Sequence, residues 1–134
     1  MNKGLRLYIE AELRGYHDTM IELEALRDDM INESPLPPDG MPRGTETSDP
    51  TFNKAMKLLT CKRLNQMHRV TYAIGNVVWS LPPDKLKLVK LKYWTKNQKY
   101  NDIGVSMELN CHVKTFYLWR AEICRAIAKE LGML

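Results

Sequence analysis

The stretch "VSMELNCHVKTFYLWR" (residues 105–120) has an apolar pattern that neither one helix nor one strand explains. Val105 and Leu109 are four residues apart, which places them on one face of a helix. Cys111 follows after only two residues, and helical spacing resumes at Phe116. The pattern therefore predicts two helices that meet at a tight corner.

The corner is expected at Asn110, because asparagine tolerates the left-handed backbone conformation better than most residues other than glycine. Ser106 is the small residue expected to let the two helices approach closely. This order of small, apolar, turn and apolar residues is typical of a helix-turn-helix, whose second helix enters the major groove of DNA. The predicted core of the motif is Val105, Ser106, Leu109, Cys111, Phe116 and Trp119, with Trp119 at its centre.

The outer face of the second helix carries the predicted DNA contacts. His112 lies at its start, where a polar side chain can cap the helix or meet a phosphate. Lys114 can reach a phosphate or a guanine, and Tyr117 a phosphate or a thymine methyl group. The predicted DNA-binding residues are His112, Val113, Lys114, Tyr117, Leu118, Arg120, Lys85 and Lys90.

A lysine-rich helix is expected to precede this motif. It is capped by Asp84 and contains the sequence "KLKLVKLKYW", in which lysines surround an apolar face. The stretch "TKNQKYN" is expected to form a turn, and Asp102 to begin the short first helix of the motif. The phosphate-facing surface is predicted to consist of Lys85, Lys87, Lys90, Lys92 and Lys114.

The charge is distributed unevenly along the chain. Residues 1–50 carry five Lys/Arg and eleven Asp/Glu, a net charge of −6, whereas residues 51–134 carry fifteen and five, a net charge of +10. A basic half of this kind indicates a polyanionic partner, although a lysine-rich solvated face would look similar.

The first half of the chain predicts two long helices that pack as an antiparallel hairpin. One helix is expected without interruption from Leu5 to Met30, with Glu10 and other acidic residues on its solvated side. Five prolines and two glycines in "SPLPPDGMPRGTETSDP" exclude a helix there, and Asp49 is expected to cap a second helix that starts at Pro50.

The predicted domains are an acidic helix at 1–33, a Pro/Gly-rich loop at 34–50, a long helix at 51–81 and a helix-turn-helix domain at 82–134. The fold class is all-α. The apolar stripes of the two long helices are Leu5, Ile9, Leu13, Tyr16, Met20, Leu23 and Met30, and Leu64, Met67, Thr71, Ile74, Val78 and Leu81. Homo-oligomerisation through these helices, including exchange of the first helix between chains, stays open.

A chain of 134 residues, 44% hydrophobic and 27% charged, suits a helical globular protein. We expect a cytoplasmic location without a membrane partner, because no apolar run approaches ~20 residues and the charged start lacks the apolar block of a secretory signal. The three cysteines show no C-x-x-C spacing and are expected to be reduced and buried.

Catalytic, cofactor and metal sites are not expected. The sequence has no glycine-rich phosphate loop and no G-x-S-x-G motif, and its three histidines are widely spaced. The carboxylates of the basic part are too scattered for the two-metal chemistry of a nuclease. We therefore predict a protein that is not an enzyme.

The sequence "LPPDKLKLVKLKYW … NDIGVSMELNCHVKTFYLWRAEI" resembles the carboxy-terminal DNA-binding domain of sigma factors. More closely, roughly the last two thirds of the chain resembles the RinA/ArpU-type phage late-gene transcriptional regulators, which have a sigma-like (region 4-like) helix-turn-helix. Thr115, Phe116, Tyr117, Trp119 and Arg120 match that family's threonine–aromatic–aromatic–x–tryptophan–arginine run. The sequence departs from the family where Ser106 replaces alanine, Asn110 the turn glycine and His112 a serine.

The resemblance implies a sequence-specific regulator of double-stranded DNA, an activator of phage late genes that acts with host RNA polymerase in the bacterial cytoplasm. Two alternatives stay open. One is a packaging adaptor similar to a phage small terminase, which is expected to form a large ring. The other is an interaction protein that binds polymerase without reading DNA.

Overall fold

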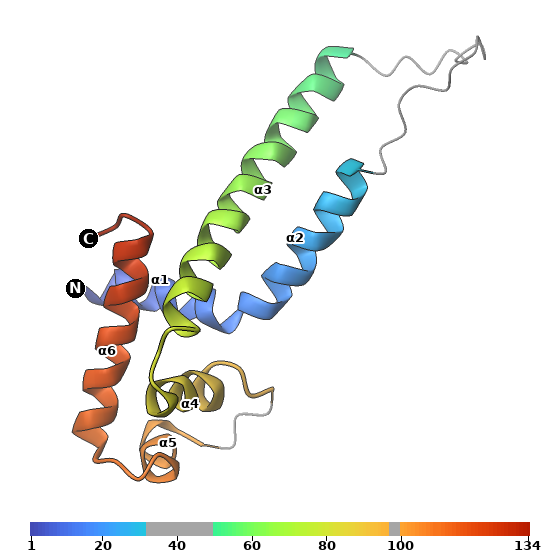
Figure 1. Cartoon of the computed structure of the whole chain (residues 1–134). Coiled ribbons are helices and arrows are strands. Elements are labelled where there is room, and N and C mark those ends of the chain that lie inside the picture. Colours follow the sequence, from blue (N-terminus) through green and yellow to red (C-terminus); the bar gives the residue numbers. More distant parts are fainter. Residues whose placement is uncertain (32–49, 97–99) are drawn as a thin grey trace. The chain divides into compact units, whose positions relative to one another are not determined.

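The computed structural model describes residues 1–31, 50–96 and 100–134 (Figure 1). Every regular element in these ranges is a helix, which confirms the all-α prediction for this part of the chain. None of these helices is both long enough and apolar enough to cross a membrane. The helices are α1 (Lys3–Arg14), α2 (Tyr16–Ile31), α3 (Pro50–Val78), α4 (Pro83–Lys92), α5 (Asp102–Glu108) and α6 (Val113–Glu130).

The chain divides into two compact units. Unit 1 combines residues 1–17 with residues 69–134, and unit 2 consists of residues 18–68. This division differs from the predicted domain boundary at residue 82, because α1 and the last turns of α3 belong to the same unit as α4, α5 and α6. The predicted Pro/Gly-rich loop and the Asp49 cap lie outside the described residues.

The prediction of one uninterrupted helix from Leu5 to Met30 is wrong at Gly15. α1 ends there, and the Gly15 N–H donates a hydrogen bond to the carbonyl of Ala11. Glycine is a poor residue for a helix interior because it loses the most backbone freedom on folding. The next residue, Tyr16, is buried and its ring stacks on the ring of Trp94 with centroids 5.4 Å apart.

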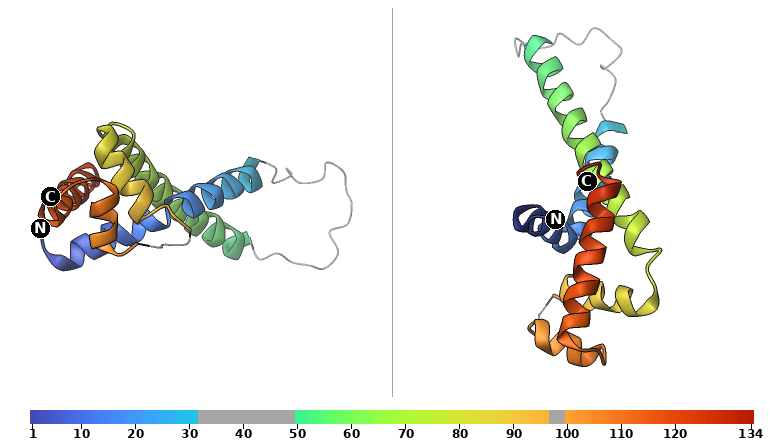
Figure 2. Two further views of the ribbon diagram at one scale, coloured as in Figure 1. Left: turned by 90° about the horizontal axis from the view of Figure 1, so that it is seen from below. Right: turned by 90° about the vertical axis from the view of Figure 1, so that its left-hand side faces the viewer.

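One hydrophobic core holds unit 1 together. It has fully buried side chains from five helices, so that α1 contributes to the same core as α5 and α6. Figure 2 shows α5 beside the first turns of α6 and α1 beside its later turns. The largest of these side chains are Phe116, Ile9, Leu13, Ile74, Leu88, Ile123 and Ile127.

Two polar contacts connect distant parts of unit 1 at the edge of this core. The indole N–H of Trp94 donates to the carbonyl of Leu13 at 2.9 Å, which ties the end of α4 to α1. The Arg69 guanidinium donates to the carbonyl of Leu131 at 2.6 Å. Arg69 thereby satisfies a carbonyl at the carboxyl end of α6, where cations are favoured by the helix dipole.

Two helices, α3 and α4, begin at a proline. α3 begins at Pro50, as predicted, and α4 begins at Pro83, where the missing N–H costs no hydrogen bond. The prediction that Asp84 caps α4 is wrong. Pro82 occupies the cap position, and Asp84 lies inside the first turn, where a carboxylate is favoured by the helix dipole.

Unit 2 contains α2 from Asp18 onward and α3 up to His68. The Arg63 guanidinium forms an ion pair with the Glu22 carboxylate and so links the two helices. Leu23 is buried, whereas Met20, which the predicted apolar stripe included, is exposed.

Candidate nucleic-acid interface

Four residues, 109–112, connect α5 to α6. Asn110 has a φ of 54°, and it is the one residue other than glycine with a positive φ in the described part of the chain. The Cys111 N–H donates to the carbonyl of Ser106 at 3.1 Å, which closes the corner after the left-handed residue. The tight corner predicted from the irregular apolar spacing is therefore present, and Asn110 makes it.

The helix before the corner is also capped by asparagine. The Asn101 side-chain oxygen accepts a hydrogen bond from the Gly104 N–H at 2.8 Å, so α5 begins at Asp102 as predicted. Val105 and Ser106 are buried, and the Ser106 hydroxyl donates to the carbonyl of Ile103 at 2.6 Å. The buried Ser106 thus satisfies its own polar group within α5.

His112 caps α6. Its Nδ1 atom accepts a hydrogen bond from the Lys114 N–H at 3.1 Å, and its backbone is extended, as expected of a residue before the first helical turn. In the neutral imidazole the proton is then on Nε2. Because His112 is exposed, this N–H is available to an acceptor outside the protein.

The first turns of α6 separate an inner from an outer side. Phe116 is fully buried, whereas Lys114, Tyr117 and Leu118 are exposed. Val113 is half-buried. Three of the predicted contacts therefore lie on an accessible surface beside His112.

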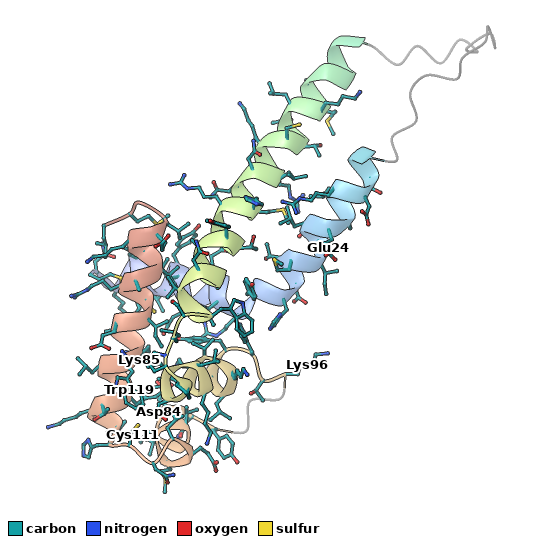
Figure 3. All side chains as sticks on the ribbon, viewed as in Figure 1. Glu24, Asp84, Lys85, Lys96, Cys111 and Trp119 are labelled. Carbon is teal, nitrogen blue, oxygen red and sulfur yellow. The ribbon has the colours of Figure 1, made fainter. Side chains whose placement is uncertain are left out.

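Trp119 does not lie at the centre of the core, contrary to the prediction. It is half-buried and packs against the core from the side, as Leu109 and Cys111 do. Figure 3 shows Trp119, Cys111 and Lys85 on the same side of unit 1. Phe116 occupies the central position instead: its side chain is fully buried, and its ring lies beneath the Lys92 ammonium of α4.

Arg120 lies away from the exposed surface. Only 16% of its side chain is accessible, and its guanidinium faces Asp102 at 3.6 Å and Glu10 at 3.8 Å. The guanidinium also lies over the Tyr117 ring at 4.8 Å from the centroid. Arg120 is therefore not a candidate DNA contact, because its guanidinium pairs with carboxylates inside unit 1.

The lysines of α4 divide into paired and accessible side chains. The Lys85 ammonium lies 2.6 Å from a Glu122 carboxylate oxygen, and the Lys87 ammonium donates to the Glu108 carbonyl at 3.3 Å. Lys90 is exposed. Lys87 and Lys90 therefore remain the accessible cations of this helix, whereas the charge of Lys85 is partly neutralised.

The expectation that Lys92 faces a phosphate is wrong. Lys92 is only 7% exposed and forms an ion pair with Asp102. Its ammonium lies 5.4 Å from the Phe116 ring centroid and 5.6 Å from that of Tyr93, at distances where a cation is attracted to an aromatic face. Lys92 thus stabilises the packing of α4 on α5 and α6.

Glu10 was expected to be solvated, but it is only 4% exposed. Its carboxylate accepts a hydrogen bond from the Tyr93 hydroxyl at 2.9 Å and faces Arg120. Burial and the neighbouring carboxylate raise the pKa of Tyr93, so this hydroxyl keeps its proton and remains a donor. The one feature of the sequence that could have indicated the burial of Glu10 is its position next to Ile9, a member of the predicted apolar stripe.

The expectation that the cysteines are buried is confirmed for Cys124 and wrong for Cys61 and Cys111, which are half-buried. Burial raises the pKa of the Cys124 thiol to about 11 and also raises the pKa of Cys111. A thiol that stays protonated at neutral pH is a weak nucleophile and a weak metal ligand. Cys61, Cys111 and Cys124 are all free, and the described residues contain no cluster of ligands that would hold a metal ion.

The outer surface of α6, with the accessible lysines of α4, thus carries most of the residues predicted to contact DNA. Comparison of the chain with protein-family models, with curated proteins and with solved structures finds no match.

Proposed function

We propose that this protein is a sequence-specific regulator that binds double-stranded DNA and activates phage late genes together with host RNA polymerase. In this proposal α5, the corner and α6 form a sigma-like helix-turn-helix, and α6 is the recognition helix. The observation that carries the proposal is the exposure of Lys114, Tyr117 and Leu118 on the first turns of α6. Phe116 anchors these same turns in the core, so the exposed side chains would be held in a fixed register.

Each accessible residue has a proposed role. Lys114 would donate to guanine O6 and N7, and Tyr117 would contact a thymine methyl group or a phosphate. The His112 Nε2–H would donate to a phosphate beside the start of the helix, where the dipole also favours an anion. Lys87 and Lys90 would contact phosphates and position the protein without reading sequence.

The remaining features fit a binding protein. We propose that α2 and α3 pair as an antiparallel hairpin, a pairing supported by the ion pair between Glu22 and Arg63. We also propose that the protein performs no catalysis, because the accessible polar residues of α4 and α6 suit contacts to nucleic acid.

Binding to duplex DNA is expected to weaken steeply with salt. Lys87, Lys90, Lys114 and Arg125 are exposed in unit 1, and each neutralised phosphate adds ~0.9 to the logarithmic slope. Four contacts would lower the affinity by roughly 100-fold between 50 and 200 mM salt. Fluorescence anisotropy at several salt concentrations measures the slope, and a flat response would contradict a phosphate-facing surface.

Lys114→Ala is expected to change sequence recognition, whereas Lys90→Ala is expected to weaken all DNA similarly. A lost bidentate guanine contact costs ~1–3 kcal/mol on the cognate site and little on unrelated DNA, because phosphate contacts carry no sequence information. The cognate duplex is first enriched from a random pool by the parent protein. Titrations then compare this duplex with its scrambled form at one salt concentration.

The two variants control for each other, since each removes one exposed lysine from unit 1. If both reduce both affinities by the same factor, α6 is not a recognition helix. Failure to enrich any sequence would favour the polymerase-binding alternative. A large ring in solution would favour the packaging alternative.

A further inference from the structure

Unit 2 buries very little of its own surface. Among its described side chains only Leu23 is buried, although the unit contains most of two long helices. Leu26, Leu64 and Met67 are only half-buried. Helices gain most of their stability in water from packing an apolar face, so the described helices of unit 2 pack weakly by themselves. An additional packing surface would therefore stabilise these two helices.

Exposed residues at helical spacing form one stripe on α2 and one stripe on α3 of unit 2. Residues three or four apart lie on the same side of a helix. The ion pair between Glu22 and Arg63 shows that a stripe of α2 adjoins a stripe of α3. All members of these stripes are exposed: Asp18, Glu22, Ala25 and Asp29 on α2, and Met56, Leu59, Arg63 and Gln66 on α3.

The two stripes carry opposite charges. The α2 stripe carries three carboxylates, Asp18, Glu22 and Asp29, whereas the charged residue of the α3 stripe is Arg63. The face is thus acidic along α2, and along α3 it combines the apolar Met56 and Leu59 with the cation of Arg63. Each half is complementary to the other half, so the complete face is complementary to a second copy of itself.

We propose that this face of unit 2 is a homodimer interface. A two-fold axis parallel to the helices places the acidic α2 stripe of each copy against the α3 stripe of the other copy, which gives an antiparallel four-helix bundle. Leu59 and Met56 of each copy pack around Ala25 of the other, and the carboxylates flank Arg63. The apolar contacts supply most of the affinity, and the charges select the partner and the register.

A dimer of this kind has a consequence that rests on the proposed function. Two copies of unit 1 would bind two half-sites, and the footprint on DNA would show two-fold symmetry. The interface itself is tested without DNA, so its failure is distinguishable from a failure of DNA binding.

The test uses two neighbouring leucines of α3 whose side chains lie on different sides of the helix. Leu59 is 60% exposed and lies on the stripe, whereas Leu58 is 57% exposed and lies on another side of the helix. Leu59→Glu is expected to weaken dimerisation at least about tenfold, because each dimer loses two buried leucines. Leu58→Glu is the matched control and is expected to leave the dimer unchanged.

Sedimentation equilibrium of the full chain measures the mass of each variant. The parent is expected at twice the 15.6 kDa chain mass at micromolar concentration. All three tryptophans lie in unit 1, so their fluorescence melt shows independently that unit 1 remains folded when dimerisation is lost.

Ala25→Lys provides a second variant that preserves helix propensity. It places a cation against Met56 and Leu59 of the second copy and is expected to weaken the dimer as Leu59→Glu does. A monomeric parent, an assembly larger than a dimer, or equal effects of Leu58→Glu and Leu59→Glu would each overturn the proposed interface.

Discussion

Phe116→Ala is expected to lower the free energy of unfolding of unit 1 by about 3–5 kcal/mol. The Phe116 ring is fully buried, contacts Tyr117 edge-on at 5.5 Å and lies beneath the Lys92 ammonium. Its removal leaves a cavity where α4, α5 and α6 meet, and it also leaves the Lys92 ammonium without one of its aromatic neighbours. Denaturant titration followed by tryptophan fluorescence measures the loss.

Two substitutions on α6 serve as controls for Phe116→Ala. Leu118→Ala is expected to change the unfolding free energy by less than ~0.5 kcal/mol, because Leu118 is exposed. Trp119→Ala is expected to fall between the two, since Trp119 is half-buried, and the other two tryptophans still report unfolding. If Phe116→Ala costs no more than Leu118→Ala, the inner face of α6 is assigned incorrectly.

Arg120→Ala is expected to destabilise unit 1 by about 3 kcal/mol, because removal of one partner leaves a buried charge uncompensated. The Glu10 carboxylate would keep the Tyr93 hydroxyl as a donor but lose the cation that faces it. Asp102 would retain its ion pair with Lys92. Most of the loss is therefore expected from Glu10, the more buried of the two carboxylates.

A double-mutant cycle tests this assignment. Glu10→Gln removes the charge but keeps an oxygen that accepts from Tyr93, so the double variant with Arg120→Ala is expected to recover ~1–2 kcal/mol. Arg125→Ala on the same helix is the matched control, because Arg125 is exposed, and it is expected to cost less than ~0.5 kcal/mol. Strictly additive losses in the cycle would show that Glu10 and Arg120 are not coupled.

Local signals in the sequence were sufficient to predict two helix starts and the corner between α5 and α6. The start of α3 at Pro50, the start of α5 at Asp102 and the left-handed Asn110 were all predicted. Each depends on the conformational preferences of one or two residues, which act whatever the rest of the chain does. The all-α class follows from the same kind of local pattern, the helical spacing of apolar residues.

The break between α1 and α2 at Gly15 depends on contacts with Trp94, which lies far away in the sequence. Glycine inside an apolar stripe is compatible with a continuous helix, at a cost of about 1 kcal/mol. The stack of Tyr16 on Trp94 and the hydrogen bond from Trp94 to the Leu13 carbonyl hold the two sides of Gly15 in place. These contacts join residues far apart in the chain, so no local pattern contains them.

Tertiary contacts also explain why the exposure of some charged side chains was predicted correctly from the sequence and that of others was not. Lys114 and Lys90 were predicted to be accessible and are exposed, and none of the ion pairs among the described residues includes them. Lys92 and Arg120 have equally basic sequence surroundings, but the fold brings Asp102 to both of them and Glu10 to Arg120. A charged side chain becomes buried only when tertiary packing supplies an opposite charge. The sequence by itself therefore determined the all-α class, the starts of α3 and α5 and the corner. Only the tertiary structure decided where α1 ends and which cations remain available to a partner.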